Sequence, residues 1–215
     1  MLIPSSPRVN RCETFGDPAR DGDDVIRAVG RRCDYGGMEQ TSTRVVYRNR
    51  WMTVREDTVR RPDGTPGVYG VVEKPDFALV LPRWADGFWL VEQYRYPAGR
   101  RAWEFPQGGW GHGIEGTSAE LARSELAEET GLRASGLTHL GHLYEAYGFS
   151  TQGFDVYLAT GLTAGEPDRE PGEQDMVHRR FTDAEVNEAI RAGLMVDAPS
   201  LAALTLYRLA TARGD

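Results

Sequence analysis

The chain has 215 residues, of which 40% are hydrophobic and 27% are charged, and its formal net charge is −7. This composition is ordinary for a globular protein. The negative charge argues against a nucleic-acid groove or an anionic membrane surface, and no stretch approaches the ~18 consecutive apolar residues of a membrane span. We therefore expect one globular domain with an N-terminal addition, and neither nucleic acid nor membrane as a partner.

The N-terminal segment, residues 1–37, differs in composition from the rest of the chain. It is rich in Arg, Asp, Gly and Pro and has almost no apolar periodicity, which predicts a disordered extension. Residues 1–4 lack the basic and apolar regions of a signal peptide. Both cysteines, Cys12 and Cys33, fall in this segment, so neither is expected to stabilise the domain core. These features favour a cytoplasmic protein.

Strand-forming residues come next. They dominate residues 44–60, and a Pro-Asp-Gly turn at 62–66 separates them from a second predicted strand at 68–73. We expect residues 38–75 to form an N-terminal β region, a hairpin outside the core, and residues 76–215 to form the main domain. The strands predicted in the main domain are residues 77–81, 87–93, 137–144, 153–159 and 176–181.

Three helices are predicted from their start signals. Thr117-Ser-Ala-Glu120 and Thr182-Asp-Ala-Glu185 are capping boxes, and Asp197 caps a last helix whose expected buried positions are Leu201, Leu204 and Leu209. The strands are interleaved with these helices without regular helical crossovers. That order excludes a doubly wound sheet and predicts an α+β fold with a mixed β-sheet between helices.

The first helix carries the strongest functional signal. On a helix, Glu125, Glu128 and Glu129 fall within roughly 100° of arc. Like charges at this spacing repel one another, so their clustering indicates a cation between them. Carboxylate oxygens suit Mg²⁺ or Mn²⁺, and we expect one of these ions as the cofactor.

The same segment resembles the Nudix box. Residues 125–132 match the family's Glu-apolar-x-Glu-Glu-x-Gly-apolar ending, although Ser124 takes the place of the family's arginine. Residues 88–97 and 103–108 are similar to the strand and turn before the box in ADP-ribose pyrophosphatases. The resemblance implies a Nudix-type α/β/α sandwich with an extra N-terminal β region and C-terminal helices. It also implies a hydrolase that splits a nucleoside diphosphate linked to another group.

The resemblance also assigns roles to residues. By resemblance, Glu125 and Glu129 bind the metal directly, Glu128 supports them, and a main-chain carbonyl near Gln107 or Gly108 adds a further ligand. These three glutamates are also the residues expected to carry catalysis.

Four further residues are expected to contact the substrate. Arg95 and Glu104 flank the turn before the box, and Tyr147 and Gln152 lie in the loop after it. In that loop the ADP-ribose subgroup has a proline and a catalytic glutamate, whose places Tyr147 and Gln152 take here. An amide does not accept a proton near neutral pH. The general base is then a box glutamate or a nearby carboxylate such as Glu145 or Glu173.

Three functions stay open from the sequence. ADP-ribose or a nucleotide sugar is the first choice of substrate, and a dinucleoside polyphosphate is the second because of Tyr147. Ser124 and Gln152 also fit a catalytically weakened module that binds a nucleotide without hydrolysing it. Finally, residues 44–73 carry more apolar surface than a hairpin buries alone, so we expect a homodimer built through them, as with the exchanged strands of ADP-ribose pyrophosphatases.

Overall fold

The computed structural model describes residues 37–110, 116–169 and 174–212. The extension predicted for residues 1–37 therefore lies outside the described residues, except for Gly37. The described chain divides into two compact units. The first, which we call the N-terminal sheet, ends at Lys74 and also includes Gly148–Ser150. The second, the core domain, contains the described residues of Pro75–Tyr147 and Thr151–Asp215.

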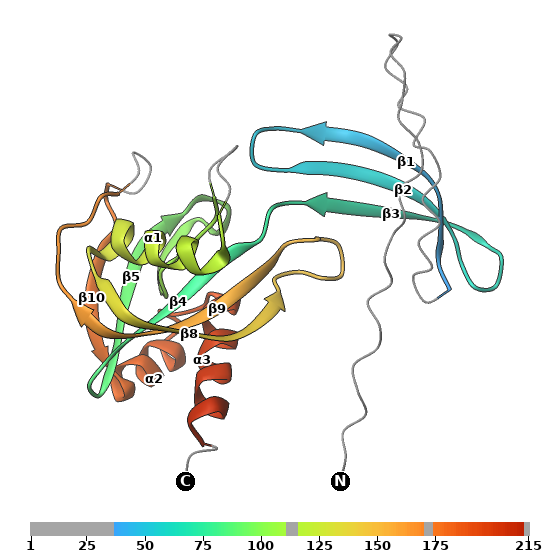
Figure 1. The fold of residues 1–215 in the computed structure, drawn as a ribbon. Helices are drawn as coiled ribbons and strands as arrows, with labels where there is room; N and C mark the ends of the chain where they lie inside the picture. Colours follow the sequence, from blue (N-terminus) through green and yellow to red (C-terminus); the bar gives the residue numbers. More distant parts are fainter. Residues whose placement is uncertain (1–36, 111–115, 170–173, 213–215) are drawn as a thin grey trace. The chain divides into compact units, whose positions relative to one another are not determined.

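The N-terminal sheet has three antiparallel strands in the order β1-β2-β3 (Figure 1). They are β1 (Glu39–Arg48), β2 (Thr53–Arg60) and β3 (Pro66–Glu73). The predicted single strand over residues 44–60 is wrong, because the chain reverses at Asn49. The Asn49 side-chain oxygen accepts hydrogen bonds from the main-chain N–H groups of Trp51 (2.8 Å) and Met52 (2.9 Å). The expected hairpin is thus a three-stranded sheet, with its first turn built by an asparagine.

The core domain contains one mixed sheet in the order β10-β5-β4-β9-β8, with β6 pairing with β5 and β7 with β4. The central pair, β4 and β9, is parallel, whereas the other pairs are antiparallel. The strands are β4 (Phe77–Trp84), β5 (Gly87–Arg95), β6 (Arg100–Glu104), β7 (Gln107–Gly108), β8 (Arg133–Tyr144), β9 (Gly153–Thr163) and β10 (Val177–Thr182). A 3₁₀ turn, η1 (Tyr96–Ala98), links β5 to β6.

Helices cover both faces of this sheet (Figure 1). They are α1 (Ser118–Thr130), α2 (Asp183–Arg191) and α3 (Ala198–Thr211). Both predicted capping boxes are present, at the starts of α1 and α2. On β4, Ala78 and Val80 pack in a cluster with α1, while Leu79 and Leu81 pack in a cluster with α2 and α3. The predicted α+β sandwich with a mixed sheet and C-terminal helices is confirmed.

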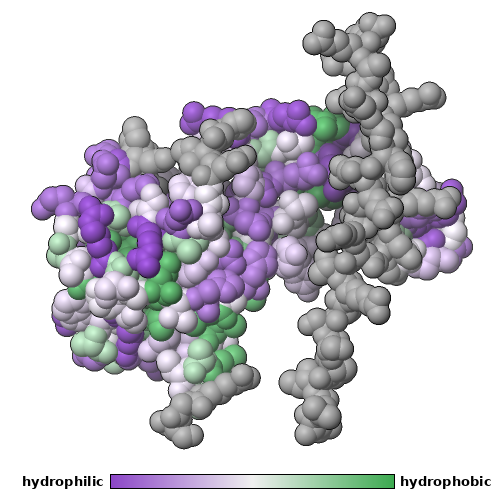
Figure 2. Space-filling view, in the orientation of Figure 1, coloured by the Kyte–Doolittle hydropathy of each residue, from purple (hydrophilic) through white to green (hydrophobic). Residues whose placement is uncertain are grey.

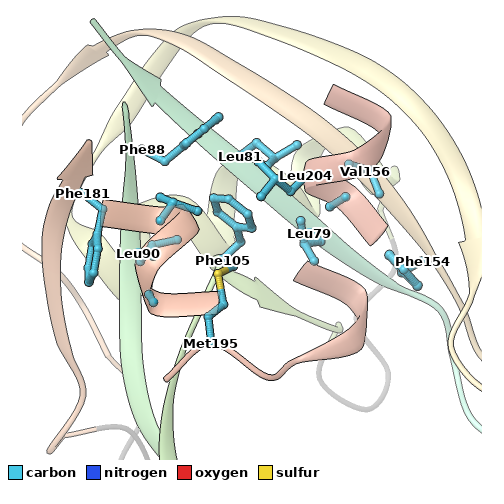
Figure 3. Close-up of a cluster of buried hydrophobic side chains, with 13 residues drawn as sticks. Leu79, Leu81, Phe88, Leu90, Phe105, Phe154, Val156, Phe181, Met195 and Leu204 are labelled. Atoms are coloured by element: carbon cyan, nitrogen blue, oxygen red, sulfur yellow. The ribbon is translucent and has the colours of Figure 1, made fainter. Parts of the chain in front are cut away.

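The larger core cluster lies between the sheet and the two C-terminal helices (Figure 3). In this cluster the Phe88 ring packs edge-on against those of Phe105 (5.4 Å) and Tyr207 (5.1 Å). The main-chain N–H of Phe105 donates to the buried Ser200 hydroxyl in the first turn of α3 (3.0 Å). The start of α3 therefore fixes the turn between β6 and β7, which carries part of the candidate site.

The outer end of α3 departs from the sequence expectation. Leu209 was expected to be buried but is 60% exposed, because it lies in the last turn of α3, where every described residue from Arg208 onward is exposed. The space-filling view shows hydrophobic residues at the surface over this helix (Figure 2). In the described part of the chain, no helix is long and apolar enough to cross a membrane.

Candidate active site

The helix α1 presents the three box glutamates from a fixed frame. Ala122 and Leu126 are buried on the sheet side of α1. Glu125 and Glu128 are half-buried at the edge of this stripe, and Glu129 is only 1% exposed. Gly131 ends the helix in the left-handed conformation (φ 72°), which favours glycine. The predicted acidic face is thus fixed against the core at its C-terminal end.

The turn before the box meets this helix at Gly108. A Cβ atom added to Gly108 would lie 2.5 Å from the carboxyl carbon and both oxygens of Glu125. A side chain at position 108 would displace that carboxylate from its present place. Gly108 also pairs with Ala78 of β4, so a strand of the central sheet holds the turn under Glu125. This close approach unites the turn and the helix that the sequence assigned to one site.

Gln107 lies beside this contact and is buried. Its side-chain amide N–H donates to Asp197 (3.1 Å), the residue that caps α3. The Gln107 side-chain oxygen is also buried and has no hydrogen-bond partner among the described residues. Gln107 pairs with Leu79 of β4 and Gly108 with Ala78, so the Gln107 side chain lies on the α3 face of the sheet, and only its main chain borders the face that carries Glu125.

Arg95 and Glu104, expected as separate substrate contacts, form one ion pair. The buried Glu104 carboxylate accepts from both Arg95 and Gln93 (Gln93 Nε2 at 2.9 Å). Burial raises the pKa of Glu104 above its ordinary value, although Arg95 opposes that shift. Burial lowers the pKa of Arg95, but attraction to Glu104, and then to Glu129 and Asp197, raises it overall. Arg95 is therefore bonded to Glu104 and is also attracted by the negative charge of Glu129 in the box.

Ser124, at the position of the family's arginine, donates its hydroxyl hydrogen bond to the Glu128 carboxylate one helical turn later. The neighbouring Arg123 points elsewhere and donates to the main-chain oxygen of Ala134 (2.7 Å). Arg123 therefore does not replace the missing arginine. One single-pronged contact to Glu128 takes the place of a two-pronged guanidinium contact.

Two contacts at the end of α1 have no signal in the sequence. The main-chain N–H of Asp168 donates to the Glu128 carbonyl (3.0 Å), and Arg169 Nε donates to the Glu129 carbonyl (3.1 Å). Asp168 and Arg169 lie about forty residues downstream in a segment without regular structure. No motif marks them, so only the folded chain shows that they belong to the box.

The loop after β8 places its residues differently. Tyr147 is 85% exposed and Glu145 is also exposed. Gln152, in contrast, is buried, and its amide donates to the Pro75 carbonyl (2.8 Å). The Gly153 N–H donates to Asp76 next to it (2.7 Å). Gln152 thus helps to join the end of this loop to the start of β4. Glu173, also considered as a base, lies outside the described residues.

The oxygen donors of this site suit a hard divalent cation. Two carboxylates of one helix, Glu125 and Glu129, are ligands that Mg²⁺ accepts, and so is a main-chain carbonyl of the turn at Gln107 and Gly108. No three His, Cys, Asp or Glu side chains in the described part of the chain are gathered closely enough to hold an ion alone. Mg²⁺ does not need such a cage, because it keeps several waters and binds substrate phosphate. The residues present therefore fit the ion.

Comparisons with known proteins agree with this geometry. Residues 74–202 match the NUDIX domain model, and residues 38–72 match the nucleoside diphosphate sugar hydrolase N-terminal domain. The ADP-ribose pyrophosphatase of Mycobacterium tuberculosis (strain ATCC 25618 / H37Rv) is 33% identical over 175 residues, covering 80% of this chain and 84% of that protein. The ADP-ribose pyrophosphatase of Bacillus subtilis (strain 168) is 33% identical over 122 residues, covering 56% and 65%.

A solved structure supports the fold separately. The crystal structure of ADP compounds hydrolase matches this chain with a TM-score of 0.71 at 22% identity, covering 80% of this chain and 92% of that one. The box geometry, the domain match over residues 74–202 and the Mycobacterium relative all lead to one assignment. The chain belongs to the Nudix hydrolase family.

Proposed function

We propose that this protein is a divalent-metal-dependent pyrophosphohydrolase that cleaves ADP-ribose or a nucleotide sugar. The observation that carries the proposal is the placing of the Glu125 carboxylate against Gly108, with Glu129 buried on the same helix face. Two relatives named ADP-ribose pyrophosphatase and the N-terminal domain match support the substrate class.

The chemistry follows from the residues on the page. When bound, Mg²⁺, or Mn²⁺ in its place, neutralises the pyrophosphate and makes a water molecule more acidic. Glu125, Glu129 and a main-chain carbonyl at Gln107 or Gly108 would hold the ion. A water oxygen attacks one phosphorus, the bond from that phosphorus to the bridging oxygen breaks, and the bridging oxygen leaves with the other phosphate.

The proton of the attacking water needs an acceptor. We assign it to Glu128, whose half-buried carboxylate is steadied by the Ser124 hydroxyl. Glu145 is the alternative, but it is exposed at the start of the loop. Gln152 donates its amide to Pro75 and has no basic atom, so it does not fill this role. Replacing Glu128 or Glu145 by Gln separates the two: loss of activity in only one variant identifies the base.

Two groups are suited to the substrate itself. The Arg95 guanidinium is 43% exposed beyond its contact with Glu104, so its free edge would pair with a phosphate. The Tyr147 ring is 85% exposed and would stack on an adenine base. That exposed ring is also the observation that favours a dinucleoside polyphosphate as the second candidate, because two bases then need stacking partners.

We also propose that the protein is a homodimer, which the N-terminal sheet supports. The cytoplasmic location expected from the composition is a further part of the proposal. Trp51 and Val68 are more than 60% exposed. The other large exposed side chains of this unit are Met38, Val45, Val46, Tyr47, Tyr69 and Phe149. Such a surface on one small sheet is typical of an interface, and a two-fold pair of copies would cover it.

A substrate panel tests the function. Phosphate-product release is measured from ADP-ribose, nucleotide sugars, dinucleoside polyphosphates and coenzyme A, each with Mg²⁺, Mn²⁺ or excess EDTA. We expect turnover of ADP-ribose or a nucleotide sugar that stops in EDTA. Undiminished turnover in EDTA would overturn the metal dependence. Tight binding of ADP-ribose without turnover of any compound would show a sensor module instead.

A further inference from the structure

The C-terminal turn of α1 carries charge of the unfavourable sign. The carbonyl end of a helix is the negative end of the helix dipole, and acidic side chains near it destabilise the helix. Glu128 and Glu129 lie in this turn, and α1, which the structure describes completely, has no basic residue in its last turn. A cation from elsewhere in the fold would offset this charge.

The carbonyl groups of that turn show where the support comes from. The last carbonyls of a helix have no partner within it. In α1 the Ala127 carbonyl accepts from the Gly131 N–H (2.8 Å), and the Glu128 carbonyl accepts from the Asp168 N–H (3.0 Å). The Glu129 carbonyl accepts from the Arg169 guanidinium (3.1 Å). Arg169 thus brings both a donor and a positive charge to the residue that is most buried among the box glutamates.

Arg169 is itself held on its other side. A terminal nitrogen of its guanidinium lies 2.8 Å from His178 Nδ1. Because a guanidinium only donates, Nδ1 is the acceptor in this pair. His178 belongs to β10, and its ring packs on Trp89 of β5 (5.7 Å between ring centroids). The half-buried Arg169 therefore links the end of the box helix to two strands of the central sheet.

We propose that Arg169 is a positioning residue for the Nudix glutamates. It lies outside the box and supports the end of α1, because this chain has Ser124 where the family has an arginine. Ser124 contacts Glu128 alone, whereas Arg169 fixes the main chain that carries Glu129. This inference rests on the proposed function only in taking the glutamates to hold the metal ion. Arg169 itself touches neither metal nor substrate.

The test compares arginines with matched contacts. Arg169→Met removes the contact with Glu129, Arg169→Lys keeps the charge but not the two-sided grip, and Arg123→Met is the control. Arg123 also donates to a main-chain carbonyl, that of Ala134, but away from the glutamates. Mn²⁺ affinity is measured without substrate from the electron paramagnetic resonance signal of free Mn²⁺. Melting temperature, kcat and KM are measured on the same samples.

We expect Arg169→Met to weaken Mn²⁺ binding about tenfold, as removal of an outer support of metal ligands does. Its kcat falls more than its KM rises, and Arg169→Lys lies between it and the wild type. Arg123→Met keeps the wild-type Mn²⁺ affinity. If Arg169→Met does not fold, the expectation for Arg169→Lys carries the test.

Three outcomes overturn the inference. They are wild-type Mn²⁺ affinity in both folded Arg169 variants, an equal loss in Arg123→Met, and a wild type that binds no Mn²⁺. The last also removes the metal from the proposed function. A wild type that binds Mn²⁺ but hydrolyses nothing in the panel contradicts the proposed function alone, because the effect of Arg169 on Mn²⁺ affinity is still measured.

Discussion

The strands β3 and β4 follow one another in the chain and are both rich in apolar residues, yet they differ completely in burial. In β4 the five residues from Ala78 to Pro82 are buried, whereas no residue of β3 is buried. Across the described residues of β1, β2 and β3 only Asp57 is buried. The difference lies in the layers: α1 covers one face of β4, and α2 and α3 cover the other.

The two units use their apolar residues for different purposes. The core domain buries its apolar residues and with them the charged groups Glu104 and Glu129. Water therefore does not screen these charges. The N-terminal sheet leaves its apolar residues at the surface, where they are available to a partner. Changes in the core domain should therefore alter chemistry and stability, and changes in the sheet should alter assembly.

The largest expected effect is on the rate, from a change in the core domain. Glu129→Gln removes one charge of the proposed metal site, so we expect turnover of the best substrate in the panel to fall about 100-fold or more. Glu188→Gln on α2, which removes an exposed carboxylate, is the control and should retain full activity. Steady-state kinetics at saturating Mg²⁺ measures both. Equal activity of the two variants would contradict the metal role of Glu129.

The second effect is on assembly. Val68→Asp changes a 65% exposed residue of β3, and Leu209→Asp changes a 60% exposed residue of α3. A buried charge at an apolar interface is unfavourable, so Val68→Asp should shift the protein from about twice the chain mass to the monomer mass of 23.9 kDa. Leu209→Asp should leave the mass unchanged. Light scattering measures the mass of both variants and of the wild type. A wild type with the mass of a monomer would contradict the proposed dimer.

Some elements of the fold can be predicted from the sequence and others cannot. The starts of α1, α2 and α3 follow from local capping residues, and the structure has them at Thr117, Thr182 and Asp197. The turn at Asn49 was missed because strand formers surround it and only the side-chain contacts of Asn49 reveal it. Leu209 was misjudged because helical spacing indicates a face of the helix but not where the covering layer ends.

For the site, the local part was predictable and the distant part was not. A motif within eight residues indicates the glutamates, and the close approach of Gly108 to Glu125 agrees with the family's turn. Arg169 and the pairing of Arg95 with Glu104 depend on strand register and on chain reversals far from the box. Spacing along a sequence does not encode such contacts.

A third, smaller effect concerns the base of the loop after β8. Gln152→Glu replaces the amide that donates to Pro75 with a buried carboxylate that repels its carbonyl oxygen. We expect a loss of about 1–3 kcal/mol in unfolding free energy, measured by urea denaturation. Gln152→Met, which removes the donor without adding charge, is the control and should lose less. Unchanged stability with a large gain in ADP-ribose turnover would instead show that this position accepts a catalytic carboxylate.

The smallest effect is a dependence of core stability on pH. Burial, and then the charge of Arg169, lowers the pKa of His178 below its ordinary value of 6.5. Below about pH 6.5 the unfolded chain binds a proton here that the folded chain resists. Stability is therefore complete above pH 6.5 and declines as the pH falls toward the folded pKa.

The variant His178→Asn tests this dependence. It keeps an acceptor for Arg169 without a titrating ring, so its stability should decline less than that of the wild type between pH 7.5 and pH 5. Urea unfolding at the two pH values gives both slopes, and equal slopes would contradict the assignment to His178. Because His178 belongs to the core domain, the mass of the assembly should not follow the same pH change. A loss of the dimer over the same pH range would contradict the expectation that changes in the core domain do not alter assembly.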